Sequence, residues 1–168
     1  MANIPSTPAD GARRVIWTAA LANPGAPTLA ELNSASNVDV SCYLTGDGWT
    51  PGLDEQTISD SRFCDRETYS RPGRSSRSLS ITYVTNPGDE DFDEAASTLV
   101  DRAKGFFVYR AGPDFDEAWA VGDLVDVWPV QMGAQSDVVD GENAVLKITQ
   151  AALPTGPVER RAAVVAGT

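Results

Sequence analysis

Residues 78–87 read SLSITYVTNP, and this stretch decides the fold class. Apolar side chains alternate there with small hydroxyl side chains, the period-two pattern of a β-strand with one face on a core. The expected core face carries Leu79, Ile81 and Tyr83. The opposite face, called the hydroxyl face below, carries Ser78, Ser80 and Thr82. Because this face lacks the Lys and Glu that commonly coat a sheet in water, it could meet bulk water, a small ligand or another protein chain.

Further strands are predicted on both sides of this stretch. They cover residues 15–17, 38–45, 106–110, 124–132 and 145–151, and residues 158–166 form a terminal strand or arm. The GDG sequence at 46–48 predicts a turn after the second of these strands. Pro129 cannot donate a hydrogen bond to a neighbouring strand, so it indicates an edge, a bend or a bulge.

Two segments carry helix signals. Thr28 and Glu31 fit the Thr-x-x-Glu capping box of a short helix or helical turn. Residues 86–105, NPGDEDFDEAASTLVDRAKG, predict the one longer helix, with acids at its start, basic residues in its last turn and Gly105 as its C-cap. Apolar residues recur in it at helical spacing, namely Phe92, Ala96, Leu99, Val100 and Ala103.

The acidic run at 89–94 also invites a calcium interpretation. An EF-hand loop counted from Asp89 needs Gly at its sixth position and Glu at its twelfth, and these positions hold Glu94 and Val100. The sequence therefore excludes an EF-hand and favours a helix start.

Six or more strands and one good helix predict a mainly β fold. A single helix cannot cover both faces of a parallel sheet, so we expect an antiparallel β-sandwich or distorted barrel with one flanking α-helix. Residues 1–168 are interpreted as a single domain. It has an N-terminal arm at 1–12, a long loop or hairpin at 46–74, and a C-terminal hinge and arm at 154–168.

The long excursion and the residues just after it hold a local cluster of basic charge. Five of the Arg residues fall within sixteen positions, at 62, 66, 71, 74 and 77. This cluster is either a solvated arginine-rich loop or a docking patch for an acidic surface on a partner or a second copy. A loop of this length in a compact domain is usually functional or disordered, and Trp49 and Phe63 indicate order on contact with something.

The overall charge excludes one large class of partner. The formal net charge is −11 and the pI is near 4.3, whereas nucleic-acid binding needs Lys and Arg against the phosphates.

Residues 1–11 lack the basic start and apolar run of a signal peptide, and no stretch approaches the roughly 20 apolar residues of a membrane span. We expect a soluble chain that has no export signal and no membrane-spanning segment.

Catalytic chemistry is poorly supported. The chain has no His, which excludes Cys–His and Ser–His nucleophile pairs within one chain, and it has no phosphate loop or dinucleotide fingerprint. Catalysis by two carboxylates is formally open, but no spacing of the acidic residues in the sequence identifies such a pair. Cys42 and Cys64 do not suffice for a zinc site; a disulfide is possible, but two buried thiols are favoured. We predict a non-enzyme without catalytic residues, metal or cofactor.

Several blocks together resemble a known family. VIWTAALANPGAPTLAELN, CYLTGDGWTPGLDEQTISDSRFC, LSITYVTNP, GDLVDVWPVQMG and TGPV occur in the order found in major tail (tail tube) proteins of long noncontractile-tailed bacteriophages, especially those infecting actinobacteria. The resemblance spans residues 13–158. It implies a β-sandwich or barrel with a flanking helix, and a homo-oligomer of stacked hexameric rings that form a hollow tube conducting DNA.

The resemblance also implies where and with what the protein acts. It implies a location in the virion tail after assembly in the host cytoplasm, no catalytic residues, and contacts with tape measure, tail terminator and tail-tip proteins. An acidic lining would let DNA slide without binding. The alternative is a virion-surface or secreted β-sandwich module that binds carbohydrate or a host surface through Trp49 or Trp119.

Two sets of candidate residues follow. The inter-subunit candidates are Trp49, Phe63, Arg71, Arg74 and Arg77, whose arginines could meet the acids at 89–94 of a neighbour. The channel-facing candidates are Ser78, Ser80 and Thr82. For this hydroxyl face, a channel or subunit contact is favoured over plain solvent, and a small-molecule site comes last.

Overall fold

Antiparallel β-strands make up most of the fold in the computed structural model, which describes residues 4–139 and 141–167. The strands are β1 (Arg13–Thr18), β2 (Val38–Asp39), β3 (Leu44–Asp60), β4 (Tyr69–Val84), β5 (Lys104–Ala111), β6 (Leu124–Met132), β7 (Ser136–Val138), β8 (Lys147–Pro154) and β9 (Glu159–Ala163). Two short α-helices, α1 (Leu29–Leu32) and α2 (Glu94–Thr98), and the 3-10 turn η1 (Glu90–Phe92) lie between strands.

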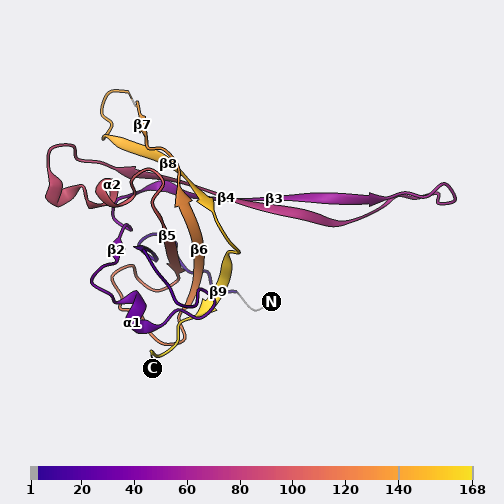
Figure 1. Cartoon of the computed structure of the whole chain (residues 1–168), viewed down its shortest axis with the longest axis horizontal. Helices are drawn as coiled ribbons and strands as arrows, with labels where there is room; N and C mark the ends of the chain where they lie inside the picture. Colours follow the sequence, from indigo (N-terminus) through magenta and orange to yellow (C-terminus); the bar gives the residue numbers. More distant parts are fainter. Residues whose placement is uncertain (1–3, 140, 168) are drawn as a thin grey trace.

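All the strands described belong to one sheet (Figure 1). Its order is β2-β1-β5-β6-β8-β4-β3, with β7 added on β8 and β9 on β6, and its named pairings are antiparallel. The sheet does not close, because β2 and β3 are not paired with each other. The prediction of a mainly β, antiparallel fold is confirmed, and the strands form one open sheet.

Apolar clusters cover both faces of the sheet. Ile81, Tyr83, Phe107 and Trp128 lie in the larger cluster, under Leu99 at the end of α2. The smaller cluster lies on the opposite face of the central strands and is formed by Ile16, Val108, Val125 and Val127 with α1, Trp119 and β9. Neighbouring residues of one strand fall in different clusters because side chains alternate across a sheet. The predicted core face of β4 is confirmed, since Leu79, Ile81 and Tyr83 are buried.

A polar network crosses the larger cluster. The Tyr83 hydroxyl donates to Gln150 Oε1 at 3.1 Å and accepts from Gln135 Nε2 at 3.1 Å. Both glutamines also donate to the Leu99 carbonyl, at 2.9 Å from Gln150 and 3.2 Å from Gln135. Burial raises the pKa of Tyr83 to about 12. The network therefore ties the end of α2 to β4 and β8.

Tyr83 gives the protein a specific alkaline sensitivity. Between pH 10 and about 12 the unfolded chain releases the Tyr83 proton and the folded chain keeps it, so stability falls as pH rises. The stability advantage of the wild type over Tyr83→Phe should shrink there by about 1.4 kcal/mol per pH unit. Urea unfolding at a series of pH values measures this. A stability advantage over Tyr83→Phe that stays constant across this pH range would contradict the assignment.

The long helix predicted over 86–105 is wrong in extent. The segment forms only η1 and α2, and Phe92 and Val100 are exposed. The Leu99 carbonyl accepts from the two glutamines, while Arg102 N donates to Met132 O at 3.0 Å and Ala103 O accepts from Met132 N at 2.8 Å. Pairing with β6 therefore replaces the next helical turn.

Gly105 is consequently a strand residue. It lies in β5, where a Cβ would come within 2.6 Å of Trp17 Cζ2, so its role is close packing rather than a C-cap. The capping box at α1 is confirmed: Thr28 N donates to Glu31 Oε2 at 2.8 Å and Glu31 N donates to Thr28 Oγ1 at 3.2 Å. A further bond from Ala22 N, and the bonds from Thr28, hold the pKa of Glu31 below its usual range.

The segment from 38 to 48 differs from the prediction. The predicted strand over 38–45 ends at Asp39, because Val40 N pairs with Val15 O and Val40 O then accepts from Tyr43 N and Leu44 N in a turn. The predicted turn at 46–48 instead lies inside β3 as an irregularity in its pairing with β4. A side chain at Gly48 would collide with the Thr82 carbonyl, which explains the glycine.

Toward the C-terminus, three predictions can be compared with the structure. The strand predicted over 145–151 is β8, which begins at Lys147 and runs on to Pro154. The terminal strand is β9, paired with β6 of the same chain. Pro129 lies where the partner of β6 changes from β9, last paired at Val127, to β8, first paired at Val130, which agrees with the predicted bend.

The prediction of two buried thiols is wrong. Cys42 and Cys64 are free and exposed, because Cys42 lies in the turn after Val40 and Cys64 lies in the turn between β3 and β4, beyond the core.

No helix among the described residues has the length and apolarity needed to span a membrane.

Candidate assembly surfaces

β3 and β4 form a hairpin that projects far from the body (Figure 1). Their pairing runs from Leu44↔Tyr83 to Asp60↔Tyr69, with irregularities between Leu44 and Trp49 and between Glu55 and Thr57. β4 pairs with β8 only as far as Leu79. Beyond that point the two strands pair only with each other, and most of their side chains are exposed. A two-stranded hairpin is marginally stable alone in water, so this one has the character of an element stabilised by contact with a partner.

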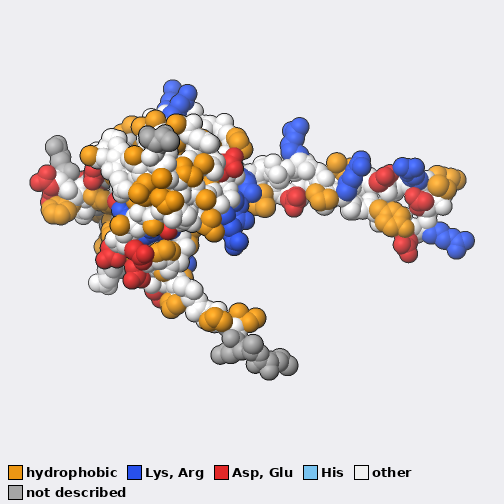
Figure 2. Space-filling model, turned by 90° about the horizontal axis from the view of Figure 1, so that it is seen from below, with side chains coloured by type: hydrophobic (Ala, Val, Ile, Leu, Met, Phe, Trp, Pro, Cys, Tyr) orange, Lys and Arg blue, Asp and Glu red, His pale blue; other side chains and the backbone are white. Residues whose placement is uncertain are grey.

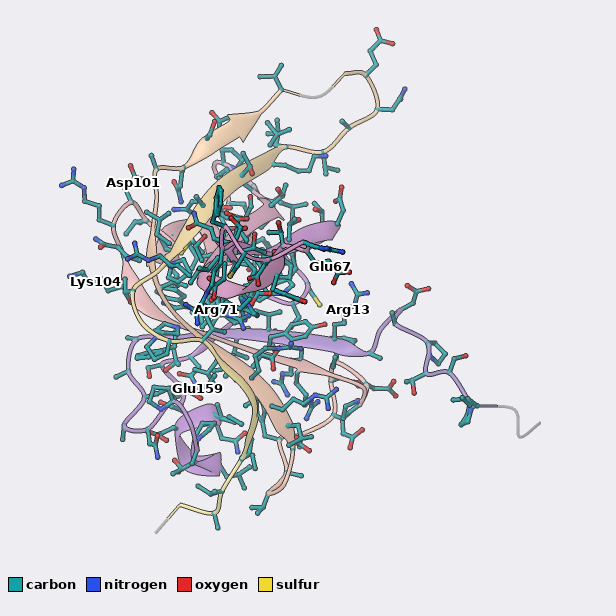
Figure 3. The ribbon with its side chains drawn as sticks, turned by 90° about the vertical axis from the view of Figure 1, so that its right-hand side faces the viewer. Arg13, Glu67, Arg71, Asp101, Lys104 and Glu159 are labelled. Atoms are coloured by element: carbon teal, nitrogen blue, oxygen red, sulfur yellow. The ribbon has the colours of Figure 1, made fainter. Side chains whose placement is uncertain are left out.

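The tip of the hairpin combines apolar side chains with charged side chains of both signs, since residues 60–67 contain three acids and two arginines. Phe63 is fully exposed, at 110% of its reference area, and Tyr69 and Ile58 are also exposed. Arg62 lies 3.5 Å from Asp60 in an exposed pair. Within the described residues the other hairpin arginines, Arg66, Arg71, Arg74 and Arg77, form no ion pair. In Figure 3, which looks at the hairpin side of the molecule, Arg71 lies in front of the body.

The hydroxyl face of β4 is open. Ser78 and Ser80 are exposed and Thr82 is half-buried, with Thr82 Oγ1 donating to Thr149 Oγ1 of β8 at 3.3 Å. The smaller apolar cluster covers this side of the sheet over β1, β5 and β6 and includes no residue of β4 or β8. Small neutral side chains therefore form a smooth, uncovered strip.

An acidic lobe lies at the end of the molecule opposite the hairpin (Figure 2). Residues 86–101 contain six acids and no Lys or Arg. Asp93 folds this lobe onto the end of β4, since its Oδ1 accepts from Thr85 Oγ1 at 2.9 Å and from Asn86 N at 3.0 Å. Asp89, Asp91 and Glu94 are exposed and form no ion pair with any described residue.

An apolar depression adjoins this lobe. It has a volume of about 660 Å³. Its lining includes Phe92, Val145 and Leu146, which are 64%, 62% and 63% exposed, together with Val84 and Pro87. An exposed apolar patch of several neighbouring side chains is typical of an interaction site.

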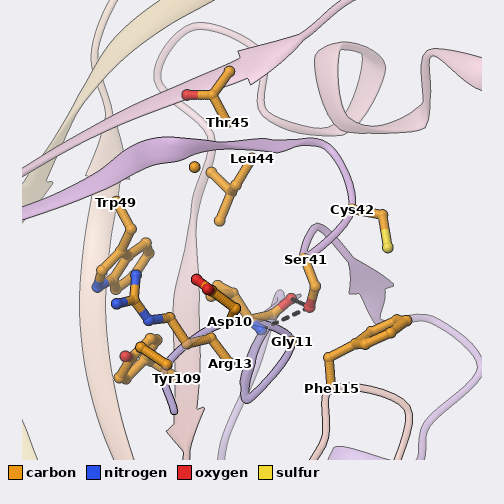
Figure 4. Close-up of a pocket in the computed structure, with 13 residues that line it drawn as sticks. Asp10, Gly11, Arg13, Ser41, Cys42, Leu44, Thr45, Trp49, Tyr109 and Phe115 are labelled. Carbon is orange, nitrogen blue, oxygen red and sulfur yellow. Dashed lines mark hydrogen bonds between the residues drawn. The ribbon is translucent and has the colours of Figure 1, made fainter.

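A second pocket, of about 270 Å³, lies at the base of the hairpin (Figure 4). Trp49 is half-buried there and stacks on Tyr109 with ring centroids 5.5 Å apart. Arg13 lies beside both rings. Ser41 Oγ accepts from Val15 N at 2.8 Å and is also bonded to Asp39, so it is engaged in holding the backbone.

Arg110 is a buried organising residue that the sequence did not reveal. It is 2% exposed and donates to Asp123 Oδ2 at 2.9 Å and to the carbonyls of Asp114, Glu117 and Ala118 at 2.7–3.1 Å. Its guanidinium also lies 4.7 Å from the centroid of Trp119. The one signal was an Arg two residues after Val108, on the strand face that also carries Phe106.

The aromatic residues of the alternative function are not free platforms. Trp119 is 5% exposed and lies between Arg14 and Arg110, at 5.0 and 4.7 Å. Trp49 already contacts Phe107, Tyr109 and Trp128. The structure thus separates the inter-subunit candidates: Trp49 lies at the hairpin base, whereas Phe63 and the arginines lie farther out.

Among the described residues, no group of three or more Cys, Asp or Glu is placed to hold a metal ion.

Comparison with known proteins gives one family. The family described as "Phage tail tube protein" matches residues 1–167. No curated protein matches the sequence. Among solved structures, a chain of the "Cryo-EM structure of the anti-feeding prophage (AFP) baseplate, 6-fold symmetrised" aligns with 94% of this chain and 96% of its own, at a TM-score of 0.49 and 10% identity. The family match over nearly the whole length shows that the chain belongs to the phage tail tube protein family.

Proposed function

We propose that this chain is the subunit that self-assembles into stacked rings of six and so builds the hollow tail tube through which phage DNA passes. Family membership makes it a virion structural protein. The observation that carries the finer proposal is the hairpin, whose part before Leu79 extends beyond the pairing with β8 and presents an exposed Phe63. Arg66, Arg71 and Arg74 of this hairpin form no ion pair with any residue that the structure describes. Such an element gains stability when a neighbouring copy covers it.

The assembled tube provides the partners in this account. Copies of the same chain are the main partner, and tape measure, terminator and tail-tip proteins meet the tube inside or at its ends. DNA passes without specific binding, because a subunit of net charge −11 repels phosphates. Assembly takes place in the host cytoplasm and the product is part of the virion. Membership of a structural family favours a non-enzymatic role.

The hydroxyl face is the proposed channel lining. Ser78, Ser80 and Thr82 are small and neutral, and the neighbouring Ala151 of β8, paired with Ser80, is small as well. A channel lining without Lys or Arg side chains makes no ion pairs with the DNA phosphates, so the duplex is free to slide. The open strip over β4 and β8 supports this placement, because the smaller apolar cluster of the described residues includes no residue of these two strands.

Cysteine labelling tests the channel placement. In a Cys42→Ser, Cys64→Ser background, Ser80→Cys should react with a bulky polyethylene-glycol maleimide in monomers but not in assembled tubes. N-ethylmaleimide, which is small enough to enter a channel, should label both. Equal bulky labelling of tubes and monomers would put Ser80 on the outer surface, and failure of N-ethylmaleimide in tubes would put it in a subunit contact.

Self-assembly itself is tested by sedimentation over a concentration series, with negative-stain microscopy of the heavy fraction. We expect rings and hollow tubes to appear as concentration rises. A heavy fraction without rings or tubes would contradict the proposal. The rival function, a carbohydrate-binding module, predicts instead that glycans protect Trp49 fluorescence from quenching; burial of Trp119 already disfavours it.

A further inference from the structure

We infer that the Asp10–Gly11 pair near the end of the N-terminal arm is a site of spontaneous isoaspartate formation, whereas the Asp47–Gly48 pair of β3 resists the same reaction. Asp-Gly pairs occur in the chain at 10–11, 47–48 and 140–141, and the structure describes both residues of the first two. The reaction needs neither an enzyme nor a partner, so this inference is independent of the proposed function.

The reaction closes a five-membered ring between the Asp side chain and the main chain. The nitrogen of the following glycine attacks the Asp Cγ carbon, a C–N bond forms, and the carboxyl hydroxyl leaves with the amide proton as water. A second water molecule then opens this succinimide. Opening at the former main-chain carbonyl gives isoaspartate, whose chain runs through Cβ, and opening at the other carbonyl restores aspartate. Glycine hinders the attack least, because it has no side chain.

Asp10 and Gly11 have the freedom that ring closure requires. They are the two central residues of a turn, in which Ala12 N donates to Ala9 O at 3.3 Å, and both are exposed. A Cβ built on Gly11 would meet no atom within 4 Å. Among the described residues, neither the Asp10 carboxylate nor Gly11 N has a hydrogen-bond partner. Both reacting groups can therefore approach each other.

The turn is also the boundary between anchored and free chain. Gly11 O accepts from Phe115 N at 2.8 Å, and Ala12 O accepts from Gly112 N at 3.0 Å. Ahead of these bonds, residues 4–9 are exposed and make no main-chain hydrogen bond with the described residues except the one that closes the turn. Asp10 can therefore rotate without disturbing β1.

The second pair, Asp47–Gly48, is held in place. Thr45 Oγ1 donates to Asp47 Oδ1 at 2.9 Å, and Thr50 Oγ1 donates to Asp47 O at 3.2 Å. Gly48 is buried against the Thr82 carbonyl. Ring closure would have to break the bond to the carboxylate and move the main chain away from Thr82. Local structure thus protects this pair, although both pairs have the same two residues.

Isoaspartate at position 10 changes the course of the arm and leaves the sheet intact. It adds one methylene group to the main chain just ahead of the anchored Gly11, and the free carboxylate is then attached to Cα. Asp10 and Gly11 line the pocket at the hairpin base, so the negative charge at its edge moves as well (Figure 4). The aged protein should keep its fold and carry an arm with a new direction.

Peptide mapping of aged full-length protein tests the inference. The wild type is incubated for weeks at about pH 5, where part of the carboxyl is in the protonated form that can lose water. Trypsin then releases Asp10 in a peptide that ends before β1, and Asp47 in the peptide covering 15–62. Electron-transfer fragmentation locates isoaspartate in each peptide. Relative to an unaged sample, it should form at Asp10 about tenfold or more faster than at Asp47, which must first give up its hydrogen bond and packing.

Two controls show whether the fold causes the difference. In urea the two pairs should react at similar rates, because neither is held in the unfolded chain. Asp10→Glu should remove the signal at position 10, since the six-membered ring that Glu would need closes far more slowly. Equal rates in the folded protein, or no isoaspartate at Asp10, would overturn the inference. A preference for Asp10 that persists in urea would overturn it too, because neighbouring residues rather than the fold would then set the rates.

Discussion

Replacing Arg110 with Met is expected to lower the free energy of unfolding by about 3–5 kcal/mol, the usual cost of removing one partner of a buried ion pair. The change removes the Arg110 hydrogen bonds to the Asp123 carboxylate and to three backbone carbonyls. Among the described residues, Asp123 Oδ2 keeps only the bond from Ala120 N, and the Glu117 carbonyl keeps the bond from Arg14. The change also removes the cation from the face of Trp119. Met fills much of the same volume, so the loss reflects polar contacts rather than a cavity. Urea unfolding at neutral pH measures the difference.

Arg160→Met is the matched control. Arg160 lies 3.7 Å from Asp126 in an exposed pair, and such pairs contribute about 0–1 kcal/mol. Arg110→Lys should fall between the two variants, because Lys keeps the charge but lacks the fork that reaches several acceptors at once. If Arg110→Met and Arg160→Met cost the same, the assignment of Arg110 as the organiser of the 112–123 loop is wrong.

Shortening the hairpin is expected to abolish tube formation while leaving the subunit folded. Asp54 and Ser76 are paired directly, so an Asn-Gly turn can join them in place of residues 55–75. The removed segment is almost entirely exposed and contributes no residue to either apolar cluster. The free energy of unfolding should therefore change by only about 1 kcal/mol, as is usual outside the core. Urea unfolding and sedimentation measure the two effects.

The control for this deletion keeps the hairpin and changes only its exposed thiol, as Cys64→Ser. It should assemble like the wild type. Tubes of normal length from the shortened protein would contradict the role of the hairpin in joining copies, and an unfolded product would show that the hairpin supports the subunit rather than the assembly.

Local patterns in the sequence predicted the strands well. Alternation at Leu79, Ile81 and Tyr83 fixes which side of β4 faces the core, because side chains alternate across a strand. The capping box at Thr28 and Glu31 was predictable for the same reason, since both partners lie within one helical turn. The hairpin followed from a long polar segment with strand-like pieces between two core strands.

Features decided by distant residues could not be predicted. The helix after Pro87 stops at Leu99 because Gln135 and Gln150, which are distant in the sequence, donate hydrogen bonds to the Leu99 carbonyl. The exposure of Cys42 and Cys64 depends on where their turns lie relative to the core. The apolar depression likewise joins Phe92 to Val145 and Leu146, which only the fold brings together.

The central claim is that copies of this chain build a hollow tube, and cryo-electron microscopy of concentrated wild-type protein tests it most directly. The account predicts stacked rings of six around an open channel lined by Ser78, Ser80 and Thr82, with each hairpin in contact with a neighbouring copy. Filaments without a central channel, or a channel lined by another surface with the hairpins free in solvent, would contradict it.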